Sequence, residues 1–318
     1  MGKPAHNAPR DHGGGLDRAI ARHGGTRGEW LDLSTGINPV PYPMPELPPD
    51  CWQALPDSTA QQRLTEAARR FWKVPEGAAI LAAPGASALI ARIPALIPAD
   101  AVQIDHPTYN EHAAAFDRHG WRIGAGEGAA RVVVNPNNPT GAFWDGEDDA
   151  TRTLLVIDES FCDLAPERSL IRLAARPGVI VLKSFGKFWG LGGLRLGFAI
   201  GDREKIGALE ESLGPWPVSG PALAIGRAAL SDEPWAEATR ARLAGDAARL
   251  DRLIGARGGK VIGGTDLFRL YDVGDASHWQ ERLARARIWS RIFPWSRSWL
   301  RLGLPGSKEG WRRLEDAL

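Results

Sequence analysis

The feature that most constrains this chain is a series of short, almost uninterrupted apolar runs separated by segments with helical periodicity. The runs cover residues 79–82, 102–104, 131–134, 154–157, 179–182 and 196–200. A strand that is apolar on both faces is typical of a parallel sheet covered by helices on both sides. We therefore predict an α/β fold whose large domain, residues 46–215, contains a mainly parallel sheet.

The pattern changes after Gly201. Helical periodicity dominates at first, and shorter elements follow. These elements predict a second, smaller α/β domain over residues 216–318. Residues 1–45 are rich in Gly, Pro and His and predict an arm that lies over another part of the molecule. The predicted helices cover residues 60–72, 203–213, 221–230, 234–254 and 277–287, and the later strands 266–271 and 299–302.

Composition argues against several classes of protein. The formal net charge is +1 and no basic run is present, so we expect no nucleic-acid partner. No stretch reaches the roughly 18–20 apolar residues of a membrane span, and the first residues contain no apolar signal-peptide core. Cys51 and Cys162 show neither a metal-ligand spacing nor a disulfide framework. We expect a cytoplasmic protein without a metal site.

Tight turns and polar side chains follow the predicted strands, where ligands bind in parallel α/β sheets. The first strand leads into Gly85, Ala86 and Ser87 at a helix start, which suits a phosphate, although an ordinary cap by Ser87 explains the same residues. The second strand precedes Tyr109, which can stack on a planar ring or simply pack. The third precedes an Asn- and Pro-rich turn that contains Asn138.

Charged residues follow the fourth and fifth strands. Asp158 ends a buried run, where a carboxylate needs a partner and a protonated ring nitrogen would serve, whereas Glu159 is expected to face the other way. Ser184 and Lys187 follow the fifth strand, and Arg195 comes eight positions after the lysine. A lone lysine is usually a solvated surface charge. Burial and nearby cations, however, lower the pKa of an amine, as a lysine that bonds covalently to a cofactor requires.

This ordered set resembles the fold-type-I pyridoxal-phosphate (PLP) enzymes of the class I/II aminotransferase superfamily. The resemblance runs from about Asp32 to the C-terminus, and its most specific motif is SFGKFWGLGGLRLG. It implies that Lys187 binds PLP covalently and then moves protons, and that Asp158 pairs with the ring nitrogen. It also implies that Asn138 binds the phenolic oxygen and that Tyr109 stacks on the ring. The implied ligands of the cofactor phosphate are Gly85, Ala86, Ser87, Ser184 and Arg195.

Within the superfamily the chain most resembles threonine-phosphate decarboxylases of cobalamin biosynthesis, which are relatives of histidinol-phosphate aminotransferases. The matching motifs are HGGG in the arm, LDLSTGINPVPYP, DESF and RIFPWSRSWLRLGLPG. The resemblance implies a homodimer that decarboxylates L-threonine O-3-phosphate to (R)-1-amino-2-propanol O-2-phosphate. It implies that Arg301 binds the substrate α-carboxylate, for which a planar guanidinium is suited. The candidates for the substrate phosphate are His12, Asn38 and Arg291.

Two alternatives stay open. The first is a PLP-dependent aminotransferase of a phosphorylated amino acid such as histidinol phosphate. Leu55 stands where many relatives have a Tyr that reaches the partner's cofactor phosphate, and Phe161 replaces another common Tyr, so both weaken this alternative. The second is a non-catalytic nucleotide-binding protein that uses the GAGEG run at residues 124–128 as a dinucleotide loop, but this run lacks the required strand-then-helix setting.

Overall fold

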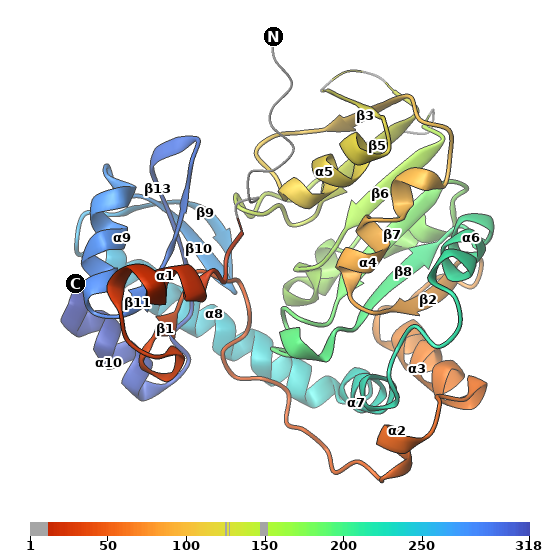
Figure 1. Ribbon diagram of the computed structural model, residues 1–318, viewed down its shortest axis with the longest axis horizontal. Helices are drawn as coiled ribbons and strands as arrows, with labels where there is room; N and C mark the ends of the chain where they lie inside the picture. Colours follow the sequence, from red (N-terminus) through yellow and green to blue (C-terminus); the bar gives the residue numbers. More distant parts are fainter. Residues whose placement is uncertain (1–11, 125, 127, 147–151) are drawn as a thin grey trace.

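The computed structural model describes residues 12–124, 126, 128–146 and 152–318, and its larger sheet has seven strands (Figure 1). The order of strands across this sheet is β2-β8-β7-β6-β5-β3-β4. Their bounds are β2 Ala79–Ala83, β3 Ala101–Ile104, β4 Arg122–Gly124, β5 Ala130–Val134, β6 Leu154–Asp158, β7 Val179–Ser184 and β8 Gly197–Gly201.

The direction of the strands decides which residues meet at one edge of this sheet. β3, β4, β5, β6 and β7 pair in parallel, and β8 pairs antiparallel with both β7 and β2. Among the described strands of the sheet only β8 is therefore reversed. The residues just before β8 consequently lie at the same edge as the residues just after the other strands. The mainly parallel α/β sheet predicted from the apolar runs is confirmed.

Helices cover both faces of this sheet because its side chains alternate between two apolar clusters. Leu155 and Ile157 of β6 belong to one cluster and Val156 to the other. Helices α3 and α7 supply Leu64 and Leu223 to the first cluster. Helices α4, α5 and α6 pack on the second. The bounds of these helices are α3 Ser58–Phe71, α4 Ala86–Ile90, α5 Asn110–Arg118, α6 Arg203–Leu213 and α7 Gly220–Leu230.

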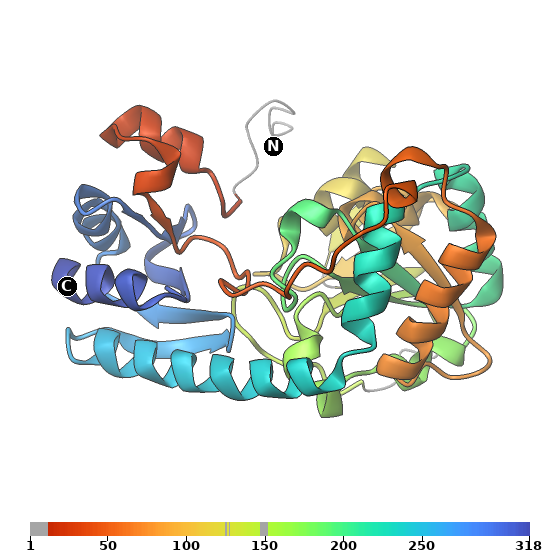
Figure 2. The ribbon, with the colours of Figure 1, turned by 90° about the horizontal axis from the view of Figure 1, so that it is seen from below.

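A four-stranded antiparallel sheet lies in the C-terminal part of the chain, with the strand order β12-β13-β10-β9. The long helix α8 runs from beside the larger sheet to the smaller one, as Figure 2 shows. Strand β9 was not predicted, because half of its six residues are exposed and two of the others are glycines. The elements of this part are α8 Glu233–Gly255, β9 Lys260–Thr265, β10 Phe268–Asp272, α9 Ala276–Arg285, β12 Arg291–Phe293, β13 Ser296–Gly303 and α10 Lys308–Ala317.

The described part of the predicted arm packs on the C-terminal part of the chain. Helix α1 (Leu16–His23) and Trp30 form a small apolar cluster with Ala284 of α9. Strand β1 (Leu31–Asp32) pairs in parallel with β11 (Ile288–Trp289). The chain then crosses to α2 (Asp50–Gln53) and the larger sheet (Figure 2). Residues 1–11 of the predicted arm lie outside the described residues.

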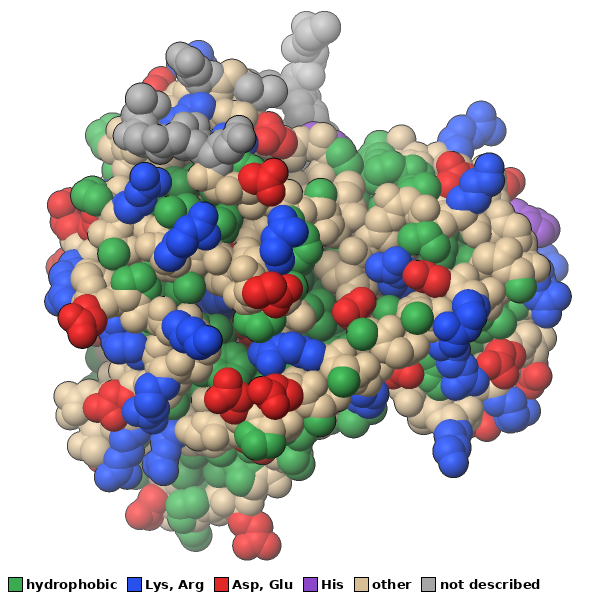
Figure 3. All heavy atoms as spheres, turned by 180° about the vertical axis from the view of Figure 1, so that it is seen from behind, with side chains coloured by type: hydrophobic (Ala, Val, Ile, Leu, Met, Phe, Trp, Pro, Cys, Tyr) green, Lys and Arg blue, Asp and Glu red, His purple; other side chains and the backbone are tan. Residues whose placement is uncertain are grey.

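The surface carries charges of both signs. Basic and acidic side chains are interspersed on the face seen in Figure 3, which agrees with the formal net charge of +1. A mixed surface of this kind gives no extended field of one sign. In the described residues, no helix combines the length and the apolar composition that crossing a membrane requires.

Candidate active site

A cavity of about 250 Å³ lies at the edge of the larger sheet where the parallel strands end. Segments that are far apart in sequence meet there, because the turns after β2, β3, β5, β6 and β7 and the turn before β8 share that edge. The cavity is lined by all nine residues predicted to bind the cofactor. They are Gly85, Ala86, Ser87, Tyr109, Asn138, Asp158, Ser184, Lys187 and Arg195.

Lys187 is the amine of this cavity. Burial and the positive charges of Arg301 and Arg195 lower the pKa of Lys187, Asp158 opposes them, and the net pKa is about 8. Its side chain keeps some exposure because it faces the cavity, and its Nζ lies 5.5 Å from the centre of the Phe161 ring. A pKa of about 8 leaves a fraction of the amine unprotonated near neutral pH, and the unprotonated amine is the form that can act as a nucleophile.

Asp158 supplies a negative charge to the same cavity and is only 2% exposed. One carboxylate oxygen lies 2.8 Å from Nε2 of His112, and the other accepts hydrogen bonds from the backbone N–H and the hydroxyl of Ser160. Burial raises the pKa of Asp158, but His112 and Ser160 outweigh burial and hold this pKa below its usual value. The carboxylate is therefore ionised and oriented before any ligand binds.

His112 is a functional candidate that the sequence analysis missed. It is 1% exposed on α5, one turn beyond Tyr109, and the two rings make an edge-to-face contact at 6.1 Å. Residues three positions apart share one face of a helix, so the sequence did contain a signal. The sequence alone does not show that α5 lies over the end of β6, and this position brings His112 to Asp158.

The turn that leads into α4 lies against Arg195. Gly85 has a φ of +84°, and a Cβ at this position would lie 2.6 Å from a guanidinium nitrogen of Arg195. Glycine is thus required both by the backbone conformation and by the approach of the guanidinium. Ser87 and Ser184 line the same end of the cavity. A guanidinium, two hydroxyls and backbone N–H groups together form a set of donors suited to a phosphate.

Arg301 lies directly behind Asn138. It is 2% exposed, and its guanidinium donates to Oδ1 of Asn138 at 2.5 Å and to the carbonyl oxygen of Ser34 at 2.6 Å. It also lies 4.9 Å from the centre of the Phe268 ring. Because the Asn138 carbonyl accepts from Arg301, its amide N–H groups remain as the donors that a cavity ligand can use.

The three residues predicted to hold a substrate phosphate are not brought together. Asn38 is buried, donates to the Phe188 carbonyl at 2.8 Å and accepts from Arg242 at 2.7 Å, and it does not line the cavity around Lys187, so its contact with substrate stays a prediction. Its amide ties the arm to the turn after Lys187. His12 lies beside Tyr109 in a separate hollow, with its Nε2 2.8 Å from a carboxylate oxygen of Glu111. Arg291 lines a different hollow, described below.

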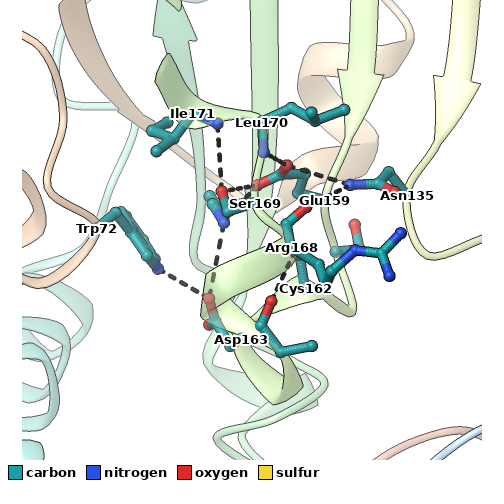
Figure 4. A network of polar contacts seen from close by, with 12 residues as sticks. Trp72, Asn135, Glu159, Cys162, Asp163, Arg168, Ser169, Leu170 and Ile171 are labelled. Atoms are coloured by element: carbon teal, nitrogen blue, oxygen red, sulfur yellow. Dashed lines mark hydrogen bonds and ion pairs between the residues drawn. The ribbon is translucent and has the colours of Figure 1, made fainter. Parts of the chain in front are cut away.

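A buried charged cluster supports the site from the other face of the sheet (Figure 4). Glu159 faces away from the cavity, as predicted, and lies 2.7 Å from Nζ of Lys183. It also accepts hydrogen bonds from the Ser169 hydroxyl and the Leu170 N–H, each at 2.6 Å. Burial lowers the pKa of Lys183, but Glu159 and the nearby Asp163 outweigh burial and raise it. Lys183 is therefore a buried cation and has a structural function.

Asp163 extends this cluster to the segment that carries Lys187. Its carboxylate accepts hydrogen bonds from the indole N–H groups of Trp72 at 2.8 Å and Trp189 at 3.1 Å. Burial raises the pKa of Asp163, and the opposing effect of Lys183 does not fully compensate. Since Trp189 is two positions after Lys187, the cluster restrains the backbone on which the amine is placed.

The alternative dinucleotide loop lies elsewhere. Gly124 ends β4 at the edge of the larger sheet, and residues 125 and 127 of the GAGEG run lie outside the described residues. The described residues of this run do not line the cavity around Lys187.

Comparison with known proteins agrees with this geometry. Residues 127–318 match the family model described as aminotransferase class I and II. The chain is 40% identical to a threonine-phosphate decarboxylase of Sinorhizobium sp over 98% of both chains. It is 38% identical to a threonine-phosphate decarboxylase of Pseudomonas aeruginosa over 97% of both chains.

A solved structure shows the same fold at lower sequence identity. It is histidinol-phosphate aminotransferase from Sinorhizobium meliloti in complex with pyridoxal-5'-phosphate. It superposes with a TM-score of 0.79 at 20% identity and covers 98% of this chain and 94% of its own. Because the family model matches more than half of its residues and two relatives match it over nearly their full length, this chain belongs to the aminotransferase class I and II family.

Proposed function

We propose that this chain is a PLP-dependent decarboxylase that converts L-threonine O-3-phosphate to (R)-1-amino-2-propanol O-2-phosphate in cobalamin biosynthesis. The observation that carries the reaction and substrate is the full-length similarity to two threonine-phosphate decarboxylases, at 40% and 38% identity. The geometry of the cavity supports the cofactor, because a partly neutral amine faces an ionised carboxylate beside a set of phosphate donors.

The cavity fits PLP at each functional group of the cofactor. Lys187 would hold it covalently, and Asp158 would pair with its ring nitrogen. Tyr109 would stack on the ring and Asn138 would donate to the phenolic oxygen. The phosphate would lie against the turn at Gly85, Ala86 and Ser87, with Ser184 and Arg195. When bound, PLP supplies an electron sink for the negative charge left at the substrate Cα after a bond is broken.

The protein decides which bond is broken by orienting the substrate. A decarboxylase would have to orient the substrate so that the bond from Cα to the carboxylate is the one that the bound cofactor weakens. Arg301, behind Asn138, would bind that carboxylate as a planar guanidinium. Lys187 is the residue that would return a proton to Cα after CO₂ leaves, because its lowered pKa suits proton transfer near neutral pH.

We further propose a cytoplasmic homodimer with an arm at residues 1–45, a large domain at 46–215 and a small domain at 216–318. Exposed apolar side chains around α2 support a second copy as partner. Met44, Trp52 and Leu55 are 59%, 70% and 67% exposed and lie close together in sequence. Monomeric proteins rarely expose clustered groups of this size, and two-fold dimers are the commonest oligomers.

Product analysis tests the proposed reaction against the aminotransferase alternative. Purified protein with PLP is incubated with L-threonine O-3-phosphate, and CO₂, the amine product and keto acid are quantified. We expect stoichiometric CO₂ and 1-amino-2-propanol phosphate. A keto acid that appears only when an amino acceptor is present, without CO₂, would establish an aminotransferase. The absence of a PLP absorbance band from saturated protein would contradict the cofactor.

A further inference from the structure

We infer that Trp295, whose ring packs against His106, limits the length of the phosphorylated side chain that this site accepts. The inference rests on the proposed function. It comes from a second cavity, of about 140 Å³, which we call the distal pocket. Tyr109 and Asn138 line both the distal pocket and the cavity around Lys187, so the two cavities lie side by side. A substrate held at Lys187 can therefore extend its side chain past Tyr109 into the distal pocket.

One side of the distal pocket comes from the larger sheet and the other from the smaller one. The turn between β3 and α5 contributes His106, Thr108 and Tyr109. The hairpin formed by β12 and β13 contributes Arg291 and Trp295. The pocket is thus formed where the two parts of the chain meet, and the hairpin turn determines how far it extends.

Arg291 gives the distal pocket its charge. Its guanidinium lies 5.1 Å from the centre of the Phe293 ring on the same hairpin, and its charge is close enough to lower the pKa of Lys187. A planar guanidinium in a small pocket suits a phosphate oxygen pair. Thr108 helps to fix the opposite side, since its hydroxyl donates to Asn137 at 2.6 Å. The chemistry of the pocket therefore fits a phosphate at the end of a short side chain.

Trp295 lines this pocket from the turn between β12 and β13. Although Trp295 is 46% exposed, its ring packs against three others. The distances between ring centres are 5.0 Å to Phe293, 4.9 Å to Trp299 and 5.7 Å to His106. The contacts with Trp299 and His106 are edge-to-face, the favoured arrangement of aromatic pairs. Two rings of its own hairpin and one from the larger sheet hold the indole in place. An indole held from both sides is a wall of fixed position.

The volume of the distal pocket limits the size of the group that can bind between Tyr109 and Trp295. At about 30 Å³ of liquid volume for each water, 140 Å³ corresponds to roughly five waters. A phosphate with its bridging oxygen has five heavy atoms and fits within this space. A side chain that carries its phosphate further from Cα would push the phosphate against Trp295. The pocket therefore selects a phosphate close to Cα, as in L-threonine O-3-phosphate.

The test compares Trp295→Ala with Trp295→Phe and with the control Trp216→Ala. Trp216 is similarly exposed, at 53%, and lines a surface hollow beside α3 and α7. Two ligands are used with the PLP-loaded protein: L-threonine O-3-phosphate, by kcat and KM, and 2-amino-5-phosphonopentanoate, by calorimetric Kd. The phosphonate carries its phosphorus four bonds from Cα, one bond further than the phosphorus of L-threonine O-3-phosphate.

We expect Trp295→Ala to bind the long phosphonate about tenfold more tightly than the wild type, because removing the indole opens space beyond the phosphate. It should raise KM for L-threonine O-3-phosphate severalfold with a smaller change in kcat. Trp295→Phe should change the Kd of the phosphonate by an intermediate amount, and Trp216→Ala should leave this Kd unchanged. If Trp295→Ala does not fold, the shift in Trp295→Phe decides the question.

An unchanged Kd for the phosphonate in the folded Trp295 variants would overturn the inference, as would an equal gain in Trp216→Ala. This outcome differs from failure of the proposed function. If the wild type releases no CO₂ from L-threonine O-3-phosphate, the proposed reaction is wrong. The calorimetric comparison still measures whether Trp295 limits the length of a phosphorylated amino acid.

Discussion

Replacing Lys187 by Met is expected to change how the stability of the cofactor-free protein depends on pH. In the folded protein the pKa of Lys187 falls from 10.5 to about 8, chiefly through burial. Between these two pH values the unfolded chain keeps a proton that the folded chain has released, so the free energy of unfolding rises with pH. Below about pH 8 the full penalty of the buried charge is present, and above about pH 10.5 it is absent.

The size of this penalty follows from the same two values. At about 1.4 kcal/mol for each pH unit, the interval from about 8 to 10.5 corresponds to about 3 kcal/mol. Met has a similar length and no charge, so it avoids the penalty. Near pH 7 the variant should therefore be more stable than the wild type by up to about 3 kcal/mol, and the difference should shrink to near zero at pH 10.5.

Urea unfolding of both proteins at several pH values between 7 and 10.5 measures this difference. Titrations shared by the two proteins cancel when their free energies of unfolding are subtracted. Lys260→Met, at an exposed lysine of β9, is the control and should give a difference that does not change with pH. A difference for Lys187→Met that is equally constant across the range would refute the reasoning, because it would mean that burial does not favour the neutral amine.

Three further predictions concern the charged residues of the site. Asp158→Asn should keep the fold but lower kcat/KM by the equivalent of roughly 3–4 kcal/mol, since a neutral amide cannot hold a ring nitrogen protonated; rates near wild type would show that the carboxylate is structural. Lys183→Met should destabilise the protein by about 3–5 kcal/mol in urea unfolding because Glu159 stays buried without its cation, and adding Glu159→Gln should restore most of the loss. Arg291→Ala should lower kcat/KM for L-threonine O-3-phosphate at least tenfold more than kcat/KM for L-threonine, whereas Arg301→Ala should lower both values. An equal loss of kcat/KM for the two substrates in Arg291→Ala would contradict the assignment of Arg291 to the substrate phosphate.

The sequence predicted the larger sheet well because its central strands are apolar on both faces. The predicted runs at residues 154–157 and 179–182 lie within β6 and β7, which are buried almost throughout. Strand β4 was missed for the opposite reason. It has three residues, all exposed, at the edge of the sheet. An edge strand is held by pairing with its neighbour, and that pairing leaves no apolar pattern in the sequence.

The site could be predicted where a residue follows its strand directly, and not where a partner comes from another element. Lys187 and Asp158 were found from their places after β7 and β6. His112 pairs with Asp158 from α5, and the position of that helix over the sheet cannot be read from local periodicity. Asn38 was predicted to contact substrate, and in the fold its side chain makes hydrogen bonds to Phe188 and Arg242 that the sequence does not indicate. A motif identifies a segment near a site, but only packing shows which side chains face the ligand.

The register of β6 and β7 explains how one sheet edge separates the charge that faces the cavity from the charges on the opposite face. Asp158 pairs with Leu182 in this parallel ladder, so the next residues, Glu159 and Lys183, are neighbours on the opposite face. The ion pair between them is therefore a cross-strand contact dictated by the register. A shift of one residue would exchange the faces, moving Asp158 away from the cavity and Glu159 toward it. Such a shift would also separate the buried ion pair, which costs several kcal/mol. The Glu159–Lys183 pair thus fixes the alignment that presents Asp158 and, one position beyond Lys183, Ser184 to the cavity.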